Sequence, residues 1–177
     1  MSEPVVFVSY SHDSPEHKAW VLRLATDLRA RGLNAILDVW DLVPGQDVAA
    51  FMQRGIANAT RVLMVCSEPY VRKSEAGLGG VGYERLIVTA EVVQSIETKK
   101  FVPLMRSNAA CSVPRFLGPR MYVDFNDDGM YAQRLEELLR ELLGVPMHPR
   151  TPNGLKGISS RDLALDGFEV LDGRGAA

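Results

Sequence analysis

Short apolar runs alternate along this sequence with amphipathic stretches that have a helical period. Apolar runs of this length, bounded by turn residues, are typical of strands buried on both faces of a sheet. Strands that alternate with helices form a parallel sheet that is covered on both sides. We therefore predict an α/β fold, a flavodoxin-like five-stranded parallel sheet with the strand order 2-1-3-4-5 and helices on both faces. The predicted strands are residues 5–8, 33–37, 62–66, 101–105 and 121–125.

Capping residues mark where the predicted helices begin. Ser14 and Asp47 each stand at an N-cap position, directly ahead of a periodic apolar pattern. A further helix is predicted to begin near Tyr83, and the last one after Asp127 or Asp128.

Glycine, proline and charge indicate the remaining connections. Residues 67–82 and 106–120 are predicted to be loops. Pro103 has no amide proton to donate to a neighbouring strand, so its strand is expected to lie at a sheet edge or to contain a bulge.

The composition changes at Gly144. Six of the 15 glycines and three of the 10 prolines fall in the last 34 residues, which hold too few apolar side chains for a core of their own. We therefore predict one domain at residues 1–144, followed at 145–177 by a tail or linker to a further domain or partner.

Charge and cysteine content narrow the classes of function. The chain has 177 residues and a net charge of −2, which gives no electrostatic footprint for nucleic acid or for an anionic membrane surface. No apolar run is long enough to span a bilayer, and the sequence starts without a signal-peptide pattern. Its two cysteines follow no spacing pattern and favour the reducing cytoplasm. We expect a cytoplasmic protein that binds neither nucleic acid nor membrane directly.

Residues 36–47 join a strand, a loop and the start of a helix. The strand runs into Asp38, and the loop carries Trp40 and a turn at Pro44 and Gly45. Such loops lie at the carboxyl ends of strands, where open α/β sheets bind ligands. Polar and aromatic residues at predicted strand ends and helix starts form the candidate site: Ser9, Tyr10, Asp38, Trp40, Asp41 and Glu84.

Several common α/β sites are absent from the sequence. A phosphorylated receiver domain needs acidic residues after the first strand and an Asp after the third, but these ends read Ser9-Tyr10 and Cys66-Ser67. Residues 77–82 match GxGxxG, yet they lie about ten residues past their strand, whereas a dinucleotide fingerprint forms the tight first turn. A flexible loop is the favoured interpretation of this segment. The sequence contains no P-loop and no GxSxG, and its histidines and cysteines have no metal spacing.

Residues 6–13, 37–45 and 82–84 together resemble the motifs of a bacterial TIR domain, and more narrowly those of its SEFIR-like branch. The resemblance covers residues 4–143 in fold order. It implies a flavodoxin-like fold, a mobile BB loop at residues 39–46 and self-association through that loop.

The resemblance also implies an activity. Many bacterial members cleave NAD+ at the nicotinamide–ribose bond, usually in antiviral or cell-suicide defence, and release ADP-ribose or a cyclised form of it. Other members are only adaptors. Glu84 matches the family's catalytic glutamate, and Tyr83 beside it is expected in the substrate site. A register based on residues 87–90 would instead put Leu86 at the catalytic position, and Glu91 is the reserve candidate. NAD+ is then the substrate, and no cofactor is expected.

Cleavage of NAD+ needs few residues. Nicotinamide in NAD+ is already cationic and leaves as a neutral molecule, so the reaction needs no general acid, unlike ordinary glycoside hydrolysis. One carboxylate near the ribose can stabilise the oxocarbenium-like transition state and bind the ribose hydroxyls. Glu84 is expected to take this role, although a glutamate in a first helical turn also simply favours the helix dipole.

The other site residues each keep a second interpretation. Trp40 either stacks on nicotinamide or adenine, or faces a partner in an interface. Asp38 and Asp41 either contact ribose or cap the loop through Asx turns. Ser9 and Tyr10 are expected to form the floor of the site, and Tyr10 equally suits half-buried packing. The cations that either meet the diphosphate or form a solvated charged face are Arg72, Lys73 and Arg85.

Three functions stay open from the sequence. The first is an NAD+ glycohydrolase or cyclase that becomes active on self-assembly, driven by a fused or docked sensor domain. The second is a non-catalytic signalling adaptor that uses the BB loop for homotypic contacts. The third is a sensor that binds a nucleotide without cleaving it. Only the enzyme requires Glu84 for its output.

Overall fold

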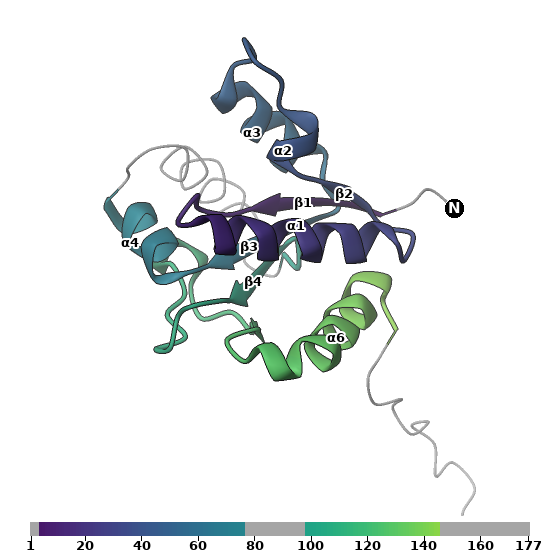
Figure 1. Cartoon of the computed structure of the whole chain (residues 1–177), viewed down its shortest axis with the longest axis vertical. Helices are drawn as coiled ribbons and strands as arrows, with labels where there is room; N and C mark the ends of the chain where they lie inside the picture. The colour runs from purple at the N-terminus through teal and green to yellow at the C-terminus, as the bar shows by residue number, and fades with distance from the viewer. Residues whose placement is uncertain (1–3, 77–97, 146–177) are drawn as a thin grey trace, which may run out of the picture. The chain divides into compact units, whose positions relative to one another are not determined.

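The computed structural model describes residues 4–76 and 98–145 (Figure 1). Five strands form one parallel sheet in the order β2-β1-β3-β4-β5, which confirms the predicted flavodoxin-like α/β fold. The predicted helix from Tyr83 and the predicted tail beyond Val145 lie outside the described residues. The strands are β1 Val5–Ser9, β2 Asn34–Ile36, β3 Arg61–Cys66, β4 Phe101–Met105 and β5 Val123–Asp124.

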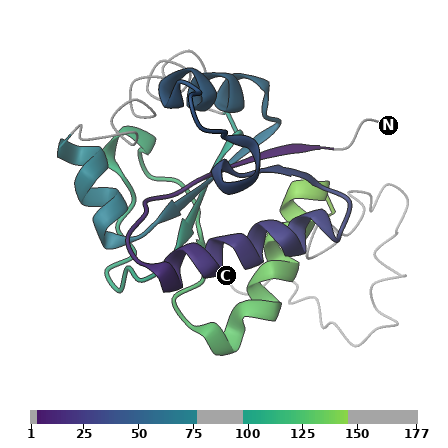
Figure 2. The ribbon, with the colours of Figure 1, turned by 45° about the horizontal axis from the view of Figure 1, so that its top comes forward.

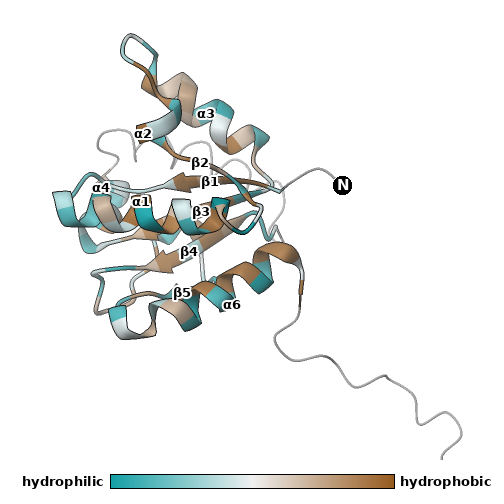
Figure 3. Cartoon of the chain, turned by 45° about the vertical axis from the view of Figure 1, so that its right-hand side comes forward, coloured by the Kyte–Doolittle hydropathy of each residue, from teal (hydrophilic) through white to brown (hydrophobic). Residues whose placement is uncertain are grey.

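Helices cover both faces of the sheet (Figure 2). One apolar cluster packs Trp20 and Leu24 of α1 and Leu138 of α6 against the strands. A second cluster, on the other face, packs Phe51 of α3 and Tyr70 of α4. The hydropathy colouring shows the apolar strands between these helices (Figure 3). The helices are α1 Pro15–Arg29, α2 Asp38–Asp41, α3 Val48–Asn58, α4 Glu68–Ala76 and α6 Tyr131–Leu143, with short 3-10 turns at Arg115–Leu117 and Asp128–Met130.

The predicted caps are present. Ser14 Oγ accepts from the amide of His17 at 3.1 Å and begins α1. Asp47 Oδ1 accepts from the amide of Ala50 at 2.9 Å and begins α3. Asp127 caps the 3-10 turn that leads into α6. These side chains satisfy backbone amides that have no partner inside the helix.

Helix α4 corrects the predicted loop at residues 67–82. Ser67 Oγ accepts from the amide of Tyr70 at 3.1 Å, so Ser67 is an N-cap. Tyr70 and Ser74, one helical turn apart, are both buried. The buried pair offsets the high charge of the segment, because a helix can be stabilised by packing one face rather than by its composition.

A short helix also occupies part of the predicted loop after β2. Asp41 Oδ2 accepts from the amide of Leu37 at 2.9 Å, and this contact begins α2 one residue after the strand ends. The predicted turn follows, with Gly45 at φ +88°, a conformation that favours glycine. The loop is therefore a structured connection with one helical turn.

Strand β4 lies between β3 and β5, so the predicted edge position of Pro103 is wrong. Pro103 is nevertheless placed where its missing amide proton is not needed. The carbonyl of Lys100 accepts from Val62 of β3, and the carbonyl of Met105 accepts from Phe125 on the other side. Because strand residues alternate, Pro103 faces the β5 side. Strand β5 pairs only with Leu104 and Met105, so no donor is needed at Pro103.

Candidate functional site

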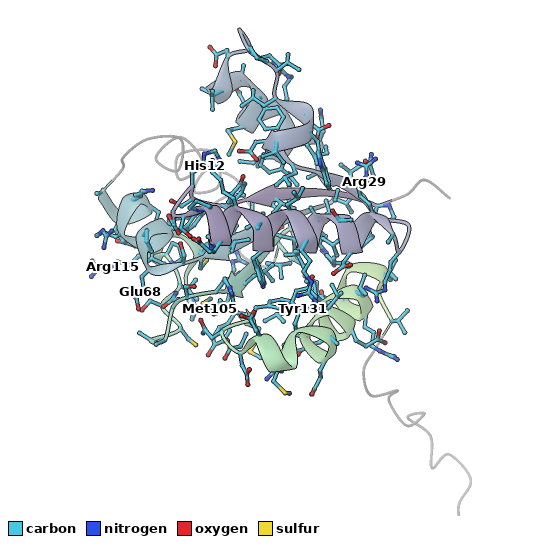
Figure 4. The ribbon with its side chains drawn as sticks, viewed as in Figure 1. His12, Arg29, Glu68, Met105, Arg115 and Tyr131 are labelled. Atoms are coloured by element: carbon cyan, nitrogen blue, oxygen red, sulfur yellow. The ribbon has the colours of Figure 1, made fainter. Side chains whose placement is uncertain are left out.

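Strand β1 lies between β2 and β3, and the connections from β1 and β3 leave the sheet in opposite directions. The carboxyl ends of β1 and β3 therefore flank a topological switch point, where open α/β sheets bind ligands. Polar side chains follow β1 directly, and His12 among them lies beside the start of α1 (Figure 4). We take this carboxyl end of the sheet as the candidate site.

Asp38 is the centre of a hydrogen-bonded group, which we call the Asp38 cluster, formed by Tyr10, His12 and Asp38. The hydroxyl of Tyr10 donates to Asp38 Oδ1 at 2.9 Å, and His12 Nε2 lies 2.6 Å from Asp38 Oδ2. The amide of Val39 also donates to Oδ1. The side chains of Asp38 and His12 are 21% and 51% exposed, so solvent and ligands can reach this carboxylate. Two of the predicted site residues, Tyr10 and Asp38, are thus brought together.

Electrostatics keep the Tyr10 phenol protonated. Burial raises the pKa of Tyr10 far above its usual range, and the negative charge and hydrogen bond of Asp38 raise it further. The Tyr10 hydroxyl therefore keeps its proton and donates it to Asp38 Oδ1, which holds the carboxylate in one orientation.

A second group of polar residues connects β1 to α4 across the switch point. Lys73 Nζ donates to Ser11 Oγ at 2.6 Å and lies 3.6 Å from Asp13 Oδ1. Ser67 Oγ donates to Asp13 Oδ2 at 2.5 Å. Of these residues only Lys73 was proposed from the sequence as a candidate ligand contact, although the polar run after β1 was a usable signal for Ser11 and Asp13.

Buried His17 lies beneath this second group. Its Nε2 is 3.9 Å from Asp13 Oδ2, and its ring centroid is 6.2 Å from that of Tyr10. Burial lowers the pKa of His17; nearby Arg106 and His12 add to this effect, and Asp13 opposes it. A neutral imidazole therefore packs under the site at neutral pH.

The other described site residues, Trp40, Asp41 and Ser9, each have contacts of their own. Trp40 is 40% exposed and has the Arg29 guanidinium carbon 5.5 Å from its ring centroid. Asp41 caps the amide of Leu37, which is the capping alternative for this residue. Ser9 is buried, with its hydroxyl 3.1 Å from that of Tyr70.

Exposed apolar side chains gather on the segment after β2. We call Val39, Trp40, Val43 and Val48 the loop patch, and each is at least 40% exposed. Apolar groups concentrated on one short segment are typical of interaction surfaces, whereas single exposed residues are not.

The remaining predicted site residues, Tyr83 and Glu84, lie outside the described residues, as do the alternatives Leu86 and Glu91 and the cation Arg85. Within residues 4–76 and 98–145, no three His, Cys, Asp or Glu side chains come together as a metal site. In the same part of the chain no helix is both long and apolar enough to cross a membrane.

Comparisons with known proteins decide the family. A family model described as TIR domain matches residues 6–139. The chain belongs to the TIR domain family. The structure of a prokaryotic SEFIR domain is similar to this TIR domain, with 33% sequence identity and a TM-score of 0.68, covering 86% of this chain and 100% of that one. The resemblance to the SEFIR-like branch is thereby confirmed.

Two receptor domains share the fold of this TIR domain. The TIR domain of a Toll-related receptor from Hydra magnipapillata is 22% identical, with a TM-score of 0.55, covering 78% of this chain and 97% of that one. The SEFIR domain of IL-17 receptor B is 12% identical, with a TM-score of 0.54, covering 78% and 96%. The comparison with curated proteins finds no match. In this TIR domain, residues 39–46 correspond to the predicted BB loop, and the Asp38 cluster lies at its base.

Proposed function

We propose that this TIR domain cleaves the nicotinamide–ribose bond of NAD+ and becomes active on self-assembly, in a cytoplasmic antiviral response. The observation that carries the proposal is the partly exposed carboxylate of Asp38, which Tyr10 and His12 orient at the carboxyl end of the sheet. An oriented carboxylate is the group that ribose hydroxyls need, because each hydroxyl can donate to it. Family membership supports the activity, since many bacterial TIR domains carry it.

The proposed division of labour uses few side chains. Glu84 stabilises the positive charge that develops on the ribose as neutral nicotinamide leaves. Asp38 binds the ribose hydroxyls, and Tyr10 and His12 hold it in place. Hydrolysis or cyclisation then follows, depending on whether water or a second group of the same molecule attacks the ribose carbon.

Self-assembly is proposed to proceed through the loop patch. The patch exposes four apolar side chains on the segment that follows Asp38 in the chain, so a partner that covers the patch would also exclude water from the base of the loop. Electrostatic contacts in a site become stronger when water is excluded. Self-assembly would therefore raise the activity by strengthening the contacts of Asp38 with the substrate.

The test is nicotinamide release by the purified protein, followed by chromatography of the products. We expect release from the wild-type protein at high concentration or with a crowding agent, and its loss in Glu84→Ala, with sedimentation showing that this variant still assembles. Release that survives in Glu84→Ala would move the catalytic role to another residue, and Glu91→Ala would be the next variant.

A non-catalytic adaptor is the second candidate, and the loop patch favours it as much as the enzyme. An adaptor needs an exposed apolar contact surface and no catalytic glutamate. Assembled wild-type protein that releases no nicotinamide, and that assembles equally well as Glu84→Ala, would establish the adaptor and overturn the enzyme.

A further inference from the structure

A cavity lies at the amino end of β4, beside β5 and α6 and away from the Asp38 cluster. Its volume is about 640 Å3, within the range of roughly 300–1,000 Å3 that is typical of small-molecule sites. Strand β4, strand β5 and helix α6, which form its walls, are neighbours in Figure 3. The apolar residues that line it include Phe101, Val102, Met121, Tyr122, Val123 and Val145.

The sheet edge inside this cavity is open. Strand β5 pairs with β4 only at Leu104 and Met105. Phe101 faces the same side of β4 as Met105, because strand residues alternate. Among the described residues, no strand pairs with β4 at Phe101 on that side.

Each acidic residue in the lining already has a cation of its own. Glu137 lies 3.0 Å from Arg134, and Glu141 lies 3.5 Å from Arg61. A third ion pair uses a basic lining residue, because Arg140 lies 2.8 Å from Glu136, which is outside the cavity. Because the charges within each of these three pairs cancel, the net charge of the cavity is set by its other residues.

Two basic residues of the cavity lining, Lys99 and Arg120, take no part in these ion pairs. Arg120 donates to the carbonyls of Leu117 and Thr98 at 2.9 and 2.7 Å, contacts that orient its guanidinium without neutralising it. Lys99 is exposed, and neither it nor Arg120 has a carboxylate partner among residues 4–76 and 98–145. The cavity thus combines apolar walls with positive charge.

We propose that this cavity binds a small organic anion with an aromatic or apolar body, whose charged group pairs with Arg120 and Lys99. The apolar walls and the Tyr122 ring take the body of the ligand, and an oriented guanidinium suits a carboxylate, phosphate or sulfonate. The site is separate from the Asp38 cluster and does not depend on NAD+ cleavage.

The test uses 8-anilinonaphthalene-1-sulfonate, an aromatic sulfonate that fluoresces when it is bound, with the full chain. We expect one binding site whose affinity falls about fivefold or more in Lys99→Gln and in Arg120→Gln, because each variant removes one ion pair. Arg54→Gln, which removes an exposed cation from α3, is the matched control and should leave the affinity unchanged. The neutral probe N-phenyl-1-naphthylamine should bind all variants equally.

Two results would overturn the proposal. Equal affinity of the sulfonate for wild type, Lys99→Gln and Arg120→Gln would show that the cavity does not hold the anion. Binding of the sulfonate could instead weaken as the protein concentration rises and return in Val43→Asp. This result would show that the loop patch of a second copy fills the cavity. Lys99→Gln keeps the test sound if Arg120→Gln fails to fold.

Discussion

Asp38 is the residue on which the proposed activity most depends among those described. We expect Asp38→Asn to lower kcat/KM for nicotinamide release about 10- to 100-fold, because one charge-assisted hydrogen bond to the ribose is lost. Asp41→Asn is the matched control, since Asp41 caps the amide of Leu37 and lies in the same short helix. Equal losses in the two variants would show that Asp38 acts only on the loop structure.

His17 links the stability of the fold to pH. Its pKa is lowered in the folded protein, chiefly by burial, so the unfolded chain binds a proton more readily. The stabilising contribution is present above the usual histidine pKa of 6.5 and is lost as the pH falls through the folded-state value. We expect urea unfolding to show a free energy of unfolding that declines from pH 7.5 to pH 5.5, with a smaller decline in His17→Gln. Identical declines in the two proteins would assign the acid sensitivity to other groups.

Single residues of the site were predictable where they stand at strand ends. Tyr10 and Asp38 follow predicted strands, and the parallel sheet brings them together. His12 was not among the candidate site residues, because its contact with Asp38 depends on how the segment after β1 meets the start of α2. Trp40 packs beside Arg29, a contact between α2 and the end of α1 that no spacing in the sequence indicates.

Helix α3 approaches strand β1 so closely that Gly55 has no room for a side chain. A Cβ atom at Gly55 would lie 2.2 Å from Phe7 Cε2 and 2.4 Å from Cδ2 of the same buried ring. We expect Gly55→Ala to lower the free energy of unfolding by about 1–3 kcal/mol from overpacking, less about 1 kcal/mol gained in helix propensity. Denaturant unfolding measures the difference.

Gln53→Ala serves as the control for this prediction. Gln53 is exposed on the same helix, so the substitution should change the stability by only about 0.5 kcal/mol or less. A Gly55→Ala variant as stable as Gln53→Ala would show that Phe7 and α3 can separate without cost.

Elements were predictable where apolar periodicity and caps agreed, as in α1, α3 and α6. Helix α4 was missed because charge and glycine dominate residues 67–82, although the Ser67 cap and the buried Tyr70 were its signals. Strand β5 is Val123–Asp124, shorter than predicted, because Met121 and Tyr122 are exposed instead of paired. Propensity and pattern do not reveal which residues of an apolar run actually meet a neighbouring strand.

In the described part of the chain, all but one of the large exposed apolar side chains lie near the two outer strands of the sheet. The loop patch follows β2, and Met121, Tyr122, Leu143 and Val145 lie around β5 and the end of α6. The exception is Leu22 on α1. Association through the loop patch therefore leaves the cavity beside β5 open to a small ligand, unless a second copy docks there.

The loop patch gives a prediction for the assembled state. We expect Val43→Asp to abolish self-association in sedimentation velocity, because a charge would be buried without a partner in the interface. Val43 is 57% exposed, so the fold should tolerate the substitution. Leu22→Asp, on the exposed face of α1, is the matched control and should assemble normally. Assembly of Val43→Asp at the wild-type concentration would place the interface elsewhere.

The measurement that tests the central claim most directly is the rate of nicotinamide release per molecule as the concentration of the protein is raised. If this TIR domain is an NAD+-cleaving enzyme activated by self-assembly, the rate per molecule rises with concentration in the wild-type protein and stays at background in Glu84→Ala. A background rate at every concentration, in wild-type protein that sedimentation shows to be assembled, would contradict the account.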